Sequence, residues 1–223
     1  GKELHEKFKI VRDIYDRADR VLGYKISEQC FKKPGFGKKI MHRTVLVKTI
    51  FTQPAVLTTS YACYKALEEK CEERNIDLTV SLLAGHSLGE YTALVVAGTL
   101  DLTDAVLLVR ERGRLMYEAG LKNPGSMLAV IGLDEETVKD ISFHSETEIS
   151  NINCPGQIVV SGAAQALVEA DKLARVKGAR ALRPLKVSGA FHSALMEPII
   201  AEFSRIVSDV RFQPAVIPVI SNV

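Results

Sequence analysis

The sequence lacks several features that would set its class at once. It has no tryptophan, and aromatic residues make up only 6% of its 223 positions. Twenty-nine Lys and Arg against 27 Asp and Glu leave a net charge of +2, too balanced to favour nucleic acid or an anionic membrane as a partner. No uncharged apolar run reaches the roughly 20 residues that a membrane helix needs, and no secretory signal is visible. We therefore predict no nucleic-acid or membrane partner and a cytoplasmic location.

Cysteine is also scarce, and its four positions show neither a CxxC pair nor a Cys/His ligand spacing. The four are Cys30, Cys63, Cys71 and Cys154. This spacing predicts free, mostly buried thiols in a reducing compartment and no metal site. Because the chain begins with Gly1 and ends in the apolar run VIPVISNV, we expect both ends to have been cut from a longer protein.

What is present is enough apolar sequence, 47%, to bury a substantial core. Apolar residues at helical spacing predict an amphipathic helix over residues 3–22, ended by Gly23. A second helix is expected to begin near the TQPA segment at 52–55, with Pro54 in its first turn. The apolar run LTVSLLA at 78–84 predicts a strand covered on both faces.

From residue 125 onward, short elements alternate regularly. Strands are expected at 126–133, 148–153, 157–162 and 181–187, with helices at 134–142 and 163–177. This β-α-β-β-α-β order is typical of a ferredoxin-like unit. We predict an α/β fold in which a doubly wound, α/β-hydrolase-like core with a parallel sheet covers residues 1–120 and 188–223. The ferredoxin-like subdomain, 121–187, is inserted into it.

The segment GHSLG at 85–89 matches G-x-S-x-G, which indicates a nucleophile where a strand leads in and a helix leads out. Both conditions are expected around Ser87. A strained turn there lifts the hydroxyl above the sheet edge, and the Leu88 N–H at the helix start can face an oxyanion. Gly85 and Gly89 would allow close approach of the backbone. An ordinary turn remains the other interpretation.

A serine nucleophile needs a base, and His192 is the best placed histidine. It follows the expected strand at 181–187 in a small-residue turn before a helix, where site residues of α/β proteins collect. A structural, hydrogen-bonding role for His192 remains open. His86 is expected to point away from its neighbour Ser87. The other three, His5, His42 and His144, lie in charged segments that we expect to be exposed.

Arg112 suggests the substrate. In the helix expected over 103–119, it shares one face with four apolar residues, Ala105, Leu108, Val109 and Met116. A guanidinium directed inward needs an anionic partner, and its planar fork suits a carboxylate. An internal salt bridge to a carboxylate of the fold explains the position equally well.

Five blocks of the chain, in this order and spacing, resemble one enzyme family. They are TQPA at 52–55, GHSLGEYTAL at 85–94, VRERGRLM at 109–116, NCPGQIVVSG at 153–162 and VSGAFHSALMEP at 187–198. Together they look like a malonyl-CoA:acyl-carrier-protein transacylase, and the acyltransferase domains of polyketide and fatty-acid synthases share these features. The resemblance covers nearly the whole chain.

This resemblance implies a role for each matching residue. Ser87 would be the acylated nucleophile, and His192 its general base and acid. Arg112 would hold the free carboxylate of the malonyl group, and the Leu88 N–H would form half of the oxyanion hole. Phe191, in the GAFH context, would narrow the pocket against an α-methyl branch.

The resemblance also implies the reaction. A malonyl group would pass from malonyl-CoA through Ser87 to an acyl carrier protein, whose phosphopantetheine supplies the accepting thiol. The enzyme would need no cofactor of its own and would act as a monomer. The basic segment 32–48 could dock an acidic carrier or simply be a solvated loop.

Two other readings stay open. One is a serine esterase or thioesterase, whose usual order is Ser, then Asp or Glu, then His. The other is an inactive acyltransferase-like fragment, because the family's G-Q-G segment and the helix after the SNV equivalent have no counterpart here.

Overall fold

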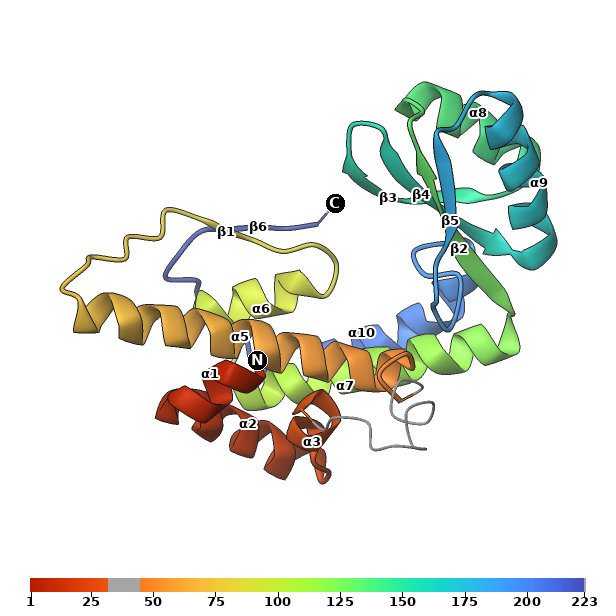
Figure 1. The fold of residues 1–223 in the computed structure, drawn as a ribbon. Helices are drawn as coiled ribbons and strands as arrows, with labels where there is room; N and C mark the ends of the chain where they lie inside the picture. The colour runs from red at the N-terminus through yellow and green to blue at the C-terminus, as the bar shows by residue number, and fades with distance from the viewer. Residues whose placement is uncertain (32–44, 223) are drawn as a thin grey trace, which may run out of the picture. The chain divides into compact units, whose positions relative to one another are not determined.

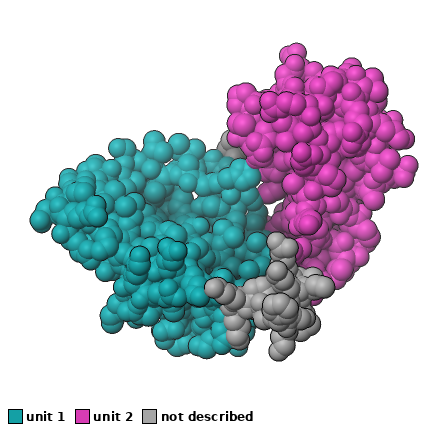
Figure 2. Space-filling model, viewed as in Figure 1, with its two compact units in different colours: residues 1–46, 50–113, 205–223 teal, residues 47–49, 114–204 magenta. Residues whose placement is uncertain are grey.

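The computed structural model describes residues 1–31 and 45–222. The chain forms two compact units (Figure 2). Unit 1 comprises residues 1–46, 50–113 and 205–223, and unit 2 comprises residues 47–49 and 114–204. The predicted mixed α/β class is confirmed, since the structure has a parallel and an antiparallel sheet. Most of the basic segment predicted at 32–48, and His42 with it, lies outside the described residues.

The elements that lie wholly or mainly in unit 1 are mostly helices (Figure 1). They are α1 (Lys2–Lys7), α2 (Lys9–Leu22), α3 (Ile26–Phe31), α5 (Thr49–Glu73), α6 (Gly89–Val96) and α7 (Leu102–Lys122), with strands β1 (Leu83–Ala84) and β6 (Val219–Ile220). The core of the unit includes α2 residues that are at most 5% exposed, such as Val11, Ile14 and Tyr15. α2 ends at Gly23 in a left-handed conformation (φ 73°), as predicted.

The prediction of a single helix over 3–22 is wrong, because Phe8 interrupts it and separates α1 from α2. Phe8 has extended backbone (φ −107°, ψ 129°) and is only 7% exposed. On the other side of the break, the His5 ring contacts the rings of Tyr15 and Phe31, with centroids 5.7 and 5.0 Å apart. His5 is therefore half-buried in an aromatic cluster rather than exposed. Tertiary packing overrides the helical pattern here.

Two further predictions in unit 1 need correction. α5 begins at Thr49, so Pro54 lies in its second turn and not its first. The strand expected over 78–84 is reduced to Leu83–Ala84, and Leu82 is 54% exposed rather than covered. Within the described residues, β1 has one ladder partner, β6, which pairs with it in parallel. The backbone of a strand must hydrogen-bond to a neighbouring strand along its length, so the apolar run alone does not determine how long the strand is.

The elements of unit 2 follow the predicted order closely. They are β2 (Gly125–Ile131), α8 (Glu135–Ser145), β3 (Glu148–Cys154), β4 (Gln157–Ala163), α9 (Ala164–Val176) and β5 (Ala181–Pro184). The strands form an antiparallel sheet in the order β3-β4-β2-β5. α8 and α9 cover the same face of that sheet (Figure 1).

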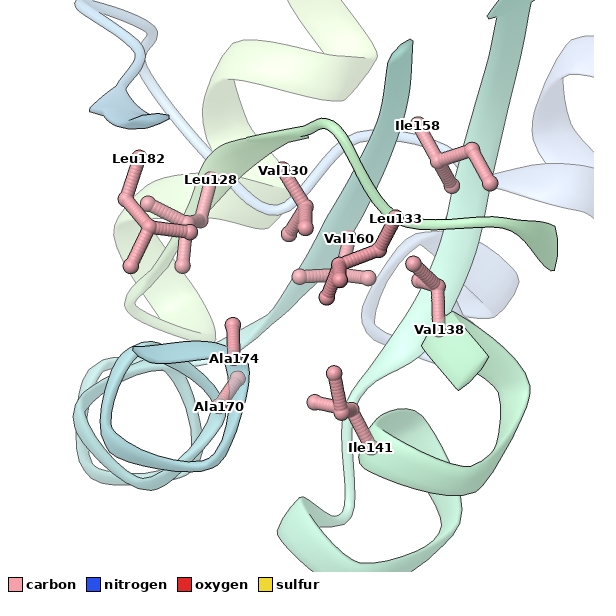
Figure 3. Packing of buried hydrophobic residues seen from close by; sticks show 10 residues of the cluster. All are labelled: Leu128, Val130, Leu133, Val138, Ile141, Ile158, Val160, Ala170, Ala174 and Leu182. Carbon is pink, nitrogen blue, oxygen red and sulfur yellow. The ribbon is translucent and has the colours of Figure 1, made fainter. Parts of the chain in front are cut away.

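The alternation of side chains along β2 and β4 gives this sheet two apolar faces. One face packs against α8 and α9 (Figure 3). The cluster there contains Leu128, Val130, Leu133, Val138, Ile141, Ile158, Val160, Ala170, Ala174 and Leu182. On the other face, Met127, Ala129 and Val159 pack with Phe191 among others. The loop that carries Phe191 is thus anchored to the sheet.

The helix predicted after His192 begins differently from expectation. Residues Ala194–Ile199 form a 3₁₀ helix, η1, and the α-helix α10 runs only over Ile200–Ser208. Pro198 within η1 has no N–H, so it cannot donate the i→i−4 hydrogen bond that an α-helix beginning at Ala194 would require of it. This accounts for the late start of the α-helix.

The cysteines are free, as predicted, but the expectation that most are buried is wrong. Cys71 is buried and Cys30 is intermediate, whereas Cys63 and Cys154 are exposed. Over the described ranges, no helix is both long enough and apolar enough to cross a membrane.

Candidate active site

Ser87 occupies a sharp turn between β1 and α6. Its φ is 50°, in the left-handed region that residues other than glycine seldom adopt. Leu88 follows as the N-cap residue of α6. The strand, turn and helix expected from GHSLG are therefore present, and the serine has the strained backbone expected of an exposed nucleophile.

Gly85 makes this turn possible. A Cβ atom at Gly85 would lie 1.9 Å from the carbonyl carbon of Gly89. A Cβ at Gly89 would meet no atom of the described residues within 4 Å. The prediction that both glycines permit close approach is right for Gly85 and wrong for Gly89.

Arg112 reaches the serine from α7. Its apolar neighbours on the predicted face are buried, with exposures of 0% for Ala105 and Val109. One guanidinium nitrogen, Nη1, donates to Oε1 of Gln53 at 2.8 Å, and Nη2 donates to Oγ of Ser87 at 3.1 Å. The guanidinium carbon also lies 5.7 Å from the centroid of the Tyr91 ring. The inward direction of Arg112 is thus confirmed.

The hydrogen-bond partners of the Arg112 guanidinium, Gln53 and Ser87, are neutral, and the Glu90 carboxylate acts on it only through longer-range attraction. Gln53 is only 4% exposed, and its amide takes the place that a carboxylate would occupy in an internal salt bridge. No carboxylate of the described residues forms a salt bridge or hydrogen bond with Arg112, so within them its partners are not an internal acid. Burial lowers the pKa of the guanidinium and raises the pKa of the Tyr91 phenol. A half-buried cation whose hydrogen-bond partners are neutral favours binding of an anion beside Ser87.

Three backbone N–H groups around the turn, those of Ser87, Gly89 and Glu90, already have acceptors. Gly89 N–H donates to the His86 carbonyl at 2.9 Å, and Glu90 N–H donates to the Ser87 carbonyl at 3.3 Å. The Ser87 N–H donates to Oδ1 of Asn222 at 3.2 Å. In the described part of the chain, the Leu88 N–H has no acceptor, in keeping with its predicted role at an oxyanion.

Asn222 and Gln53 are contacts that the sequence interpretation missed. Asn222 lies just beyond β6, whose carboxyl end meets that of β1 because the two strands are parallel. Asn222 could have been suspected from its sequence position, since site residues gather at the carboxyl ends of parallel strands. Gln53 lies within the TQPA block, which belongs to the family resemblance but to which that resemblance assigns no role.

His192 and Phe191 belong to unit 2. His192 is exposed and has a positive φ of 59°, like Ser87. Ser161 Oγ donates to the Phe191 carbonyl at 3.0 Å, and Ser193 Oγ donates to the Ala190 carbonyl at 2.7 Å. The loop is thus fixed on both sides of His192. The pairing of His192 with Ser87, and the pocket role of Phe191, stay predictions.

Two further histidines of the described residues have exposed side chains. His86 is exposed, and so is His144 on α8, whose Nδ1 lies 2.8 Å from the Asp140 carbonyl oxygen. Among the residues that the structure describes, no group of three or more His, Cys, Asp or Glu side chains is arranged to hold a metal ion.

A serine at a strained strand-to-helix turn, with an inward arginine on its hydroxyl, is the arrangement expected of an α/β enzyme with a serine nucleophile. The chain belongs to the acyl transferase domain family, whose model matches residues 1–223.

The relatives narrow this class further. The chain is 40% identical over 228 residues to the malonyl CoA-acyl carrier protein transacylase of Bacillus subtilis (strain 168), covering all of this chain and 68% of that protein. The transacylase structure from Coxiella burnetii matches with a TM-score of 0.88 at 32% identity, covering 100% of this chain and 67% of that one. A malonyl-transacylase in complex with a type II PKS acyl-carrier protein matches with a TM-score of 0.86 at 35% identity, over 99% and 68%.

These relatives are longer than the chain. It spans 57% of some curated transacylases, such as the one from Staphylococcus aureus (strain MRSA252), and 68% of the Bacillus subtilis protein.

Proposed function

We propose that the protein transfers a malonyl group from malonyl-CoA to the phosphopantetheine thiol of an acyl carrier protein. The observation that supports this best is the contact between Arg112 Nη2 and Ser87 Oγ at 3.1 Å. In a malonyl thioester, only one methylene carbon separates the carboxylate from the carbonyl carbon that is attacked. A guanidinium that binds this carboxylate must therefore lie directly beside the nucleophile, as Arg112 does.

The reaction proceeds in two halves through an ester on Ser87. In the first, Ser87 Oγ attacks the thioester carbon and passes its proton to His192, while the Leu88 N–H stabilises the oxyanion. The C–S bond then breaks, and the CoA sulfur leaves with the proton from His192. In the second half, the carrier thiol gives its proton to His192 and attacks the ester. Collapse of that intermediate returns the proton to Ser87.

The substrate's shape would be read at two positions. Arg112 selects a diacid over acetyl or long acyl groups and orients it for attack. Phe191 narrows the pocket against an α-methyl branch. The protein needs no cofactor of its own in this scheme, because the phosphopantetheine belongs to the carrier. The product would supply extender units for fatty-acid or polyketide synthesis in the cytoplasm.

The domain division is part of the proposal. Residues 1–120 and 188–223 would form the doubly wound, hydrolase-like core, for which the parallel pairing of β1 with β6 beside Ser87 is the support. Residues 121–187 would form the ferredoxin-like subdomain. Its support is the strand order β3-β4-β2-β5, with α8 and α9 on one face.

The test is incubation with malonyl-CoA, followed by mass spectrometry of the peptide that contains Ser87. We expect a malonyl ester on Ser87 that persists in water and is discharged by a carrier thiol. Ser87→Ala should carry no ester, and His192→Ala should form it about 10²–10⁴-fold more slowly. An ester that hydrolyses as fast as it forms would favour an esterase instead. Unmodified wild-type Ser87 would refute the proposed transfer.

A further inference from the structure

Asn222 holds the turn that carries Ser87 from both sides. Its Nδ2 donates to the Gly85 carbonyl at 2.7 Å, and its Oδ1 accepts from the Ser87 N–H at 3.2 Å. These two backbone groups flank His86, so a single side chain spans the bend between β1 and α6. The contact joins segments that are 135 residues apart in sequence.

Asn222 is itself held in place by α6 and by β6. Its backbone N–H donates to Oε2 of Glu90 at 3.1 Å, and its Nδ2 makes a second bond to the same oxygen. The strand register pairs Leu83 with Val219 and Ala84 with Ile220. Asn222 lies two residues beyond the end of β6, and the same register, if continued, brings it opposite the turn.

The chemistry of the side chain fits this position closely. Gly85 presents an acceptor and Ser87 a donor, and a primary amide offers one donor group and one acceptor at the required separation. A carboxylate has acceptors alone, so it could not satisfy the Gly85 carbonyl. Because the Ser87 N–H is occupied by Asn222, the adjacent Leu88 N–H is the donor left for an oxyanion.

We infer that Asn222 is a positioning residue for the nucleophile, an inference that rests on the proposed acyl transfer through Ser87. It maintains the left-handed backbone of Ser87 (φ 50°) and thereby fixes the direction of Oγ and of the Leu88 N–H. Such backbone strain persists only where surrounding contacts determine it. Asn222 is exposed, so its hydrogen bonds contribute little to global stability and act mainly on the geometry of the turn.

The test compares Asn222→Ala, Asn222→Asp and the matched control Ser221→Ala. Single-turnover acylation of Ser87 by malonyl-CoA should be about 10–100-fold slower in N222A, the loss expected from a displacement of about 1 Å. KM for malonyl-CoA should change less than about threefold, because Arg112 is untouched. N222D should be at least as slow, since its carboxylate would face both the Gly85 carbonyl and Glu90. S221A should match the wild type.

A second readout separates this inference from the proposed function. Labelling of Ser87 by a fluorophosphonate reports the geometry of the nucleophile whatever acyl group it normally carries. It should fall in N222A in parallel with acylation, while thermal unfolding remains close to that of the wild type. Wild-type protein that is labelled but not malonylated would refute malonyl transfer and leave the labelling comparison intact.

Two outcomes would overturn the role of Asn222. One is wild-type labelling and acylation in N222A. The other is a loss that only follows the folded fraction of each variant. If N222A does not fold, N222D carries the test. Glu90→Gln, which keeps an oxygen acceptor for Asn222, should retain most of the acylation rate and serves as the conservative variant of the network.

Discussion

At the scale of single residues, the neutral partner of Arg112 is the most informative contact. A buried cation that the fold neutralises with a carboxylate has little affinity left for a substrate anion. Gln53 instead orients the guanidinium through a 2.8 Å hydrogen bond and leaves its charge available. The Gln53 amide therefore orients the guanidinium without neutralising the charge that a substrate carboxylate would bind.

This contact predicts weaker use of malonyl-CoA after substitution at either of its two residues. Arg112→Ala should lower the preference for malonyl-CoA over acetyl-CoA about 10–100-fold, the loss expected for hydrogen bonds to a charged group. Arg112→Lys should recover only part of it, because an ammonium lacks the planar fork. Gln53→Glu should raise KM for malonyl-CoA by a similar factor, since its carboxylate would pair with the guanidinium. The measurement is the ratio of kcat/KM for the two thioesters.

The matched control is Arg110→Ala. Arg110 lies on the same helix but pairs with Glu111, so its loss should leave the ratio unchanged. Malonyl preference that survives in Arg112→Ala would contradict the carboxylate role.

Sequence patterns predicted Ser87 and Arg112 but not their partners Asn222 and Gln53. Ser87 and Arg112 could be found from sequence because their signals are local: a short motif and a helical face. Asn222 could not, because its role depends on a strand pairing between segments far apart in the chain. The place of Gln53 opposite Arg112 likewise follows from how α5 packs with α7, which no local pattern encodes.

At the scale of elements, the turn from β1 to α6 distinguishes the two glycines of its motif. Gly85→Ala should destabilise the protein by about 1–3 kcal/mol or more, because the added Cβ would lie 1.9 Å from the Gly89 carbonyl carbon. Gly89→Ala should be neutral or stabilising by up to about 1 kcal/mol, because alanine favours the helix and meets no atom there. Urea unfolding of both variants measures the difference. Equal destabilisation by the two would contradict the geometry.

The elements of unit 2 were predictable because short strands and helices alternate regularly there, and α8 also carries a local start signal. Asp134 caps α8 by accepting from the Thr137 N–H at 2.7 Å, and this bond holds the pKa of the Asp134 carboxyl below its ordinary value. The length of β1 was predicted wrongly because a strand of two residues is too short to show a periodic pattern in the sequence. The break between α1 and α2 was missed because the burial of Phe8, and not helix propensity, determines it.

At the scale of the whole molecule, unit 2 contains a core cluster made of its own residues, between its sheet and the helices α8 and α9. Ile141 on α8 is 1% exposed within that cluster. Ile141→Ala should therefore lower the free energy of unfolding by about 2–5 kcal/mol. Hydrogen exchange of the β2 and β4 amides measures this directly, because those strands line the same cluster.

Val176→Ala is the control for that experiment. Val176 ends α9 at 83% exposure, so its truncation should change the same amide protection by less than about 0.5 kcal/mol. Equal effects of the two substitutions would mean that the cluster is not the stabilising core of the unit.

The left-handed backbone at Ser87 also restricts which nucleophiles evolution or engineering could install there. A threonine at φ 50° would bring a branched Cβ against its own backbone, so the hydroxyl cannot simply be moved to a secondary alcohol. Cysteine has the unbranched shape of serine and fits the same turn. The turn thus admits exchange of oxygen for sulfur, which would convert the acyl-enzyme ester into a thioester, while it disfavours exchange of one hydroxyl amino acid for the other.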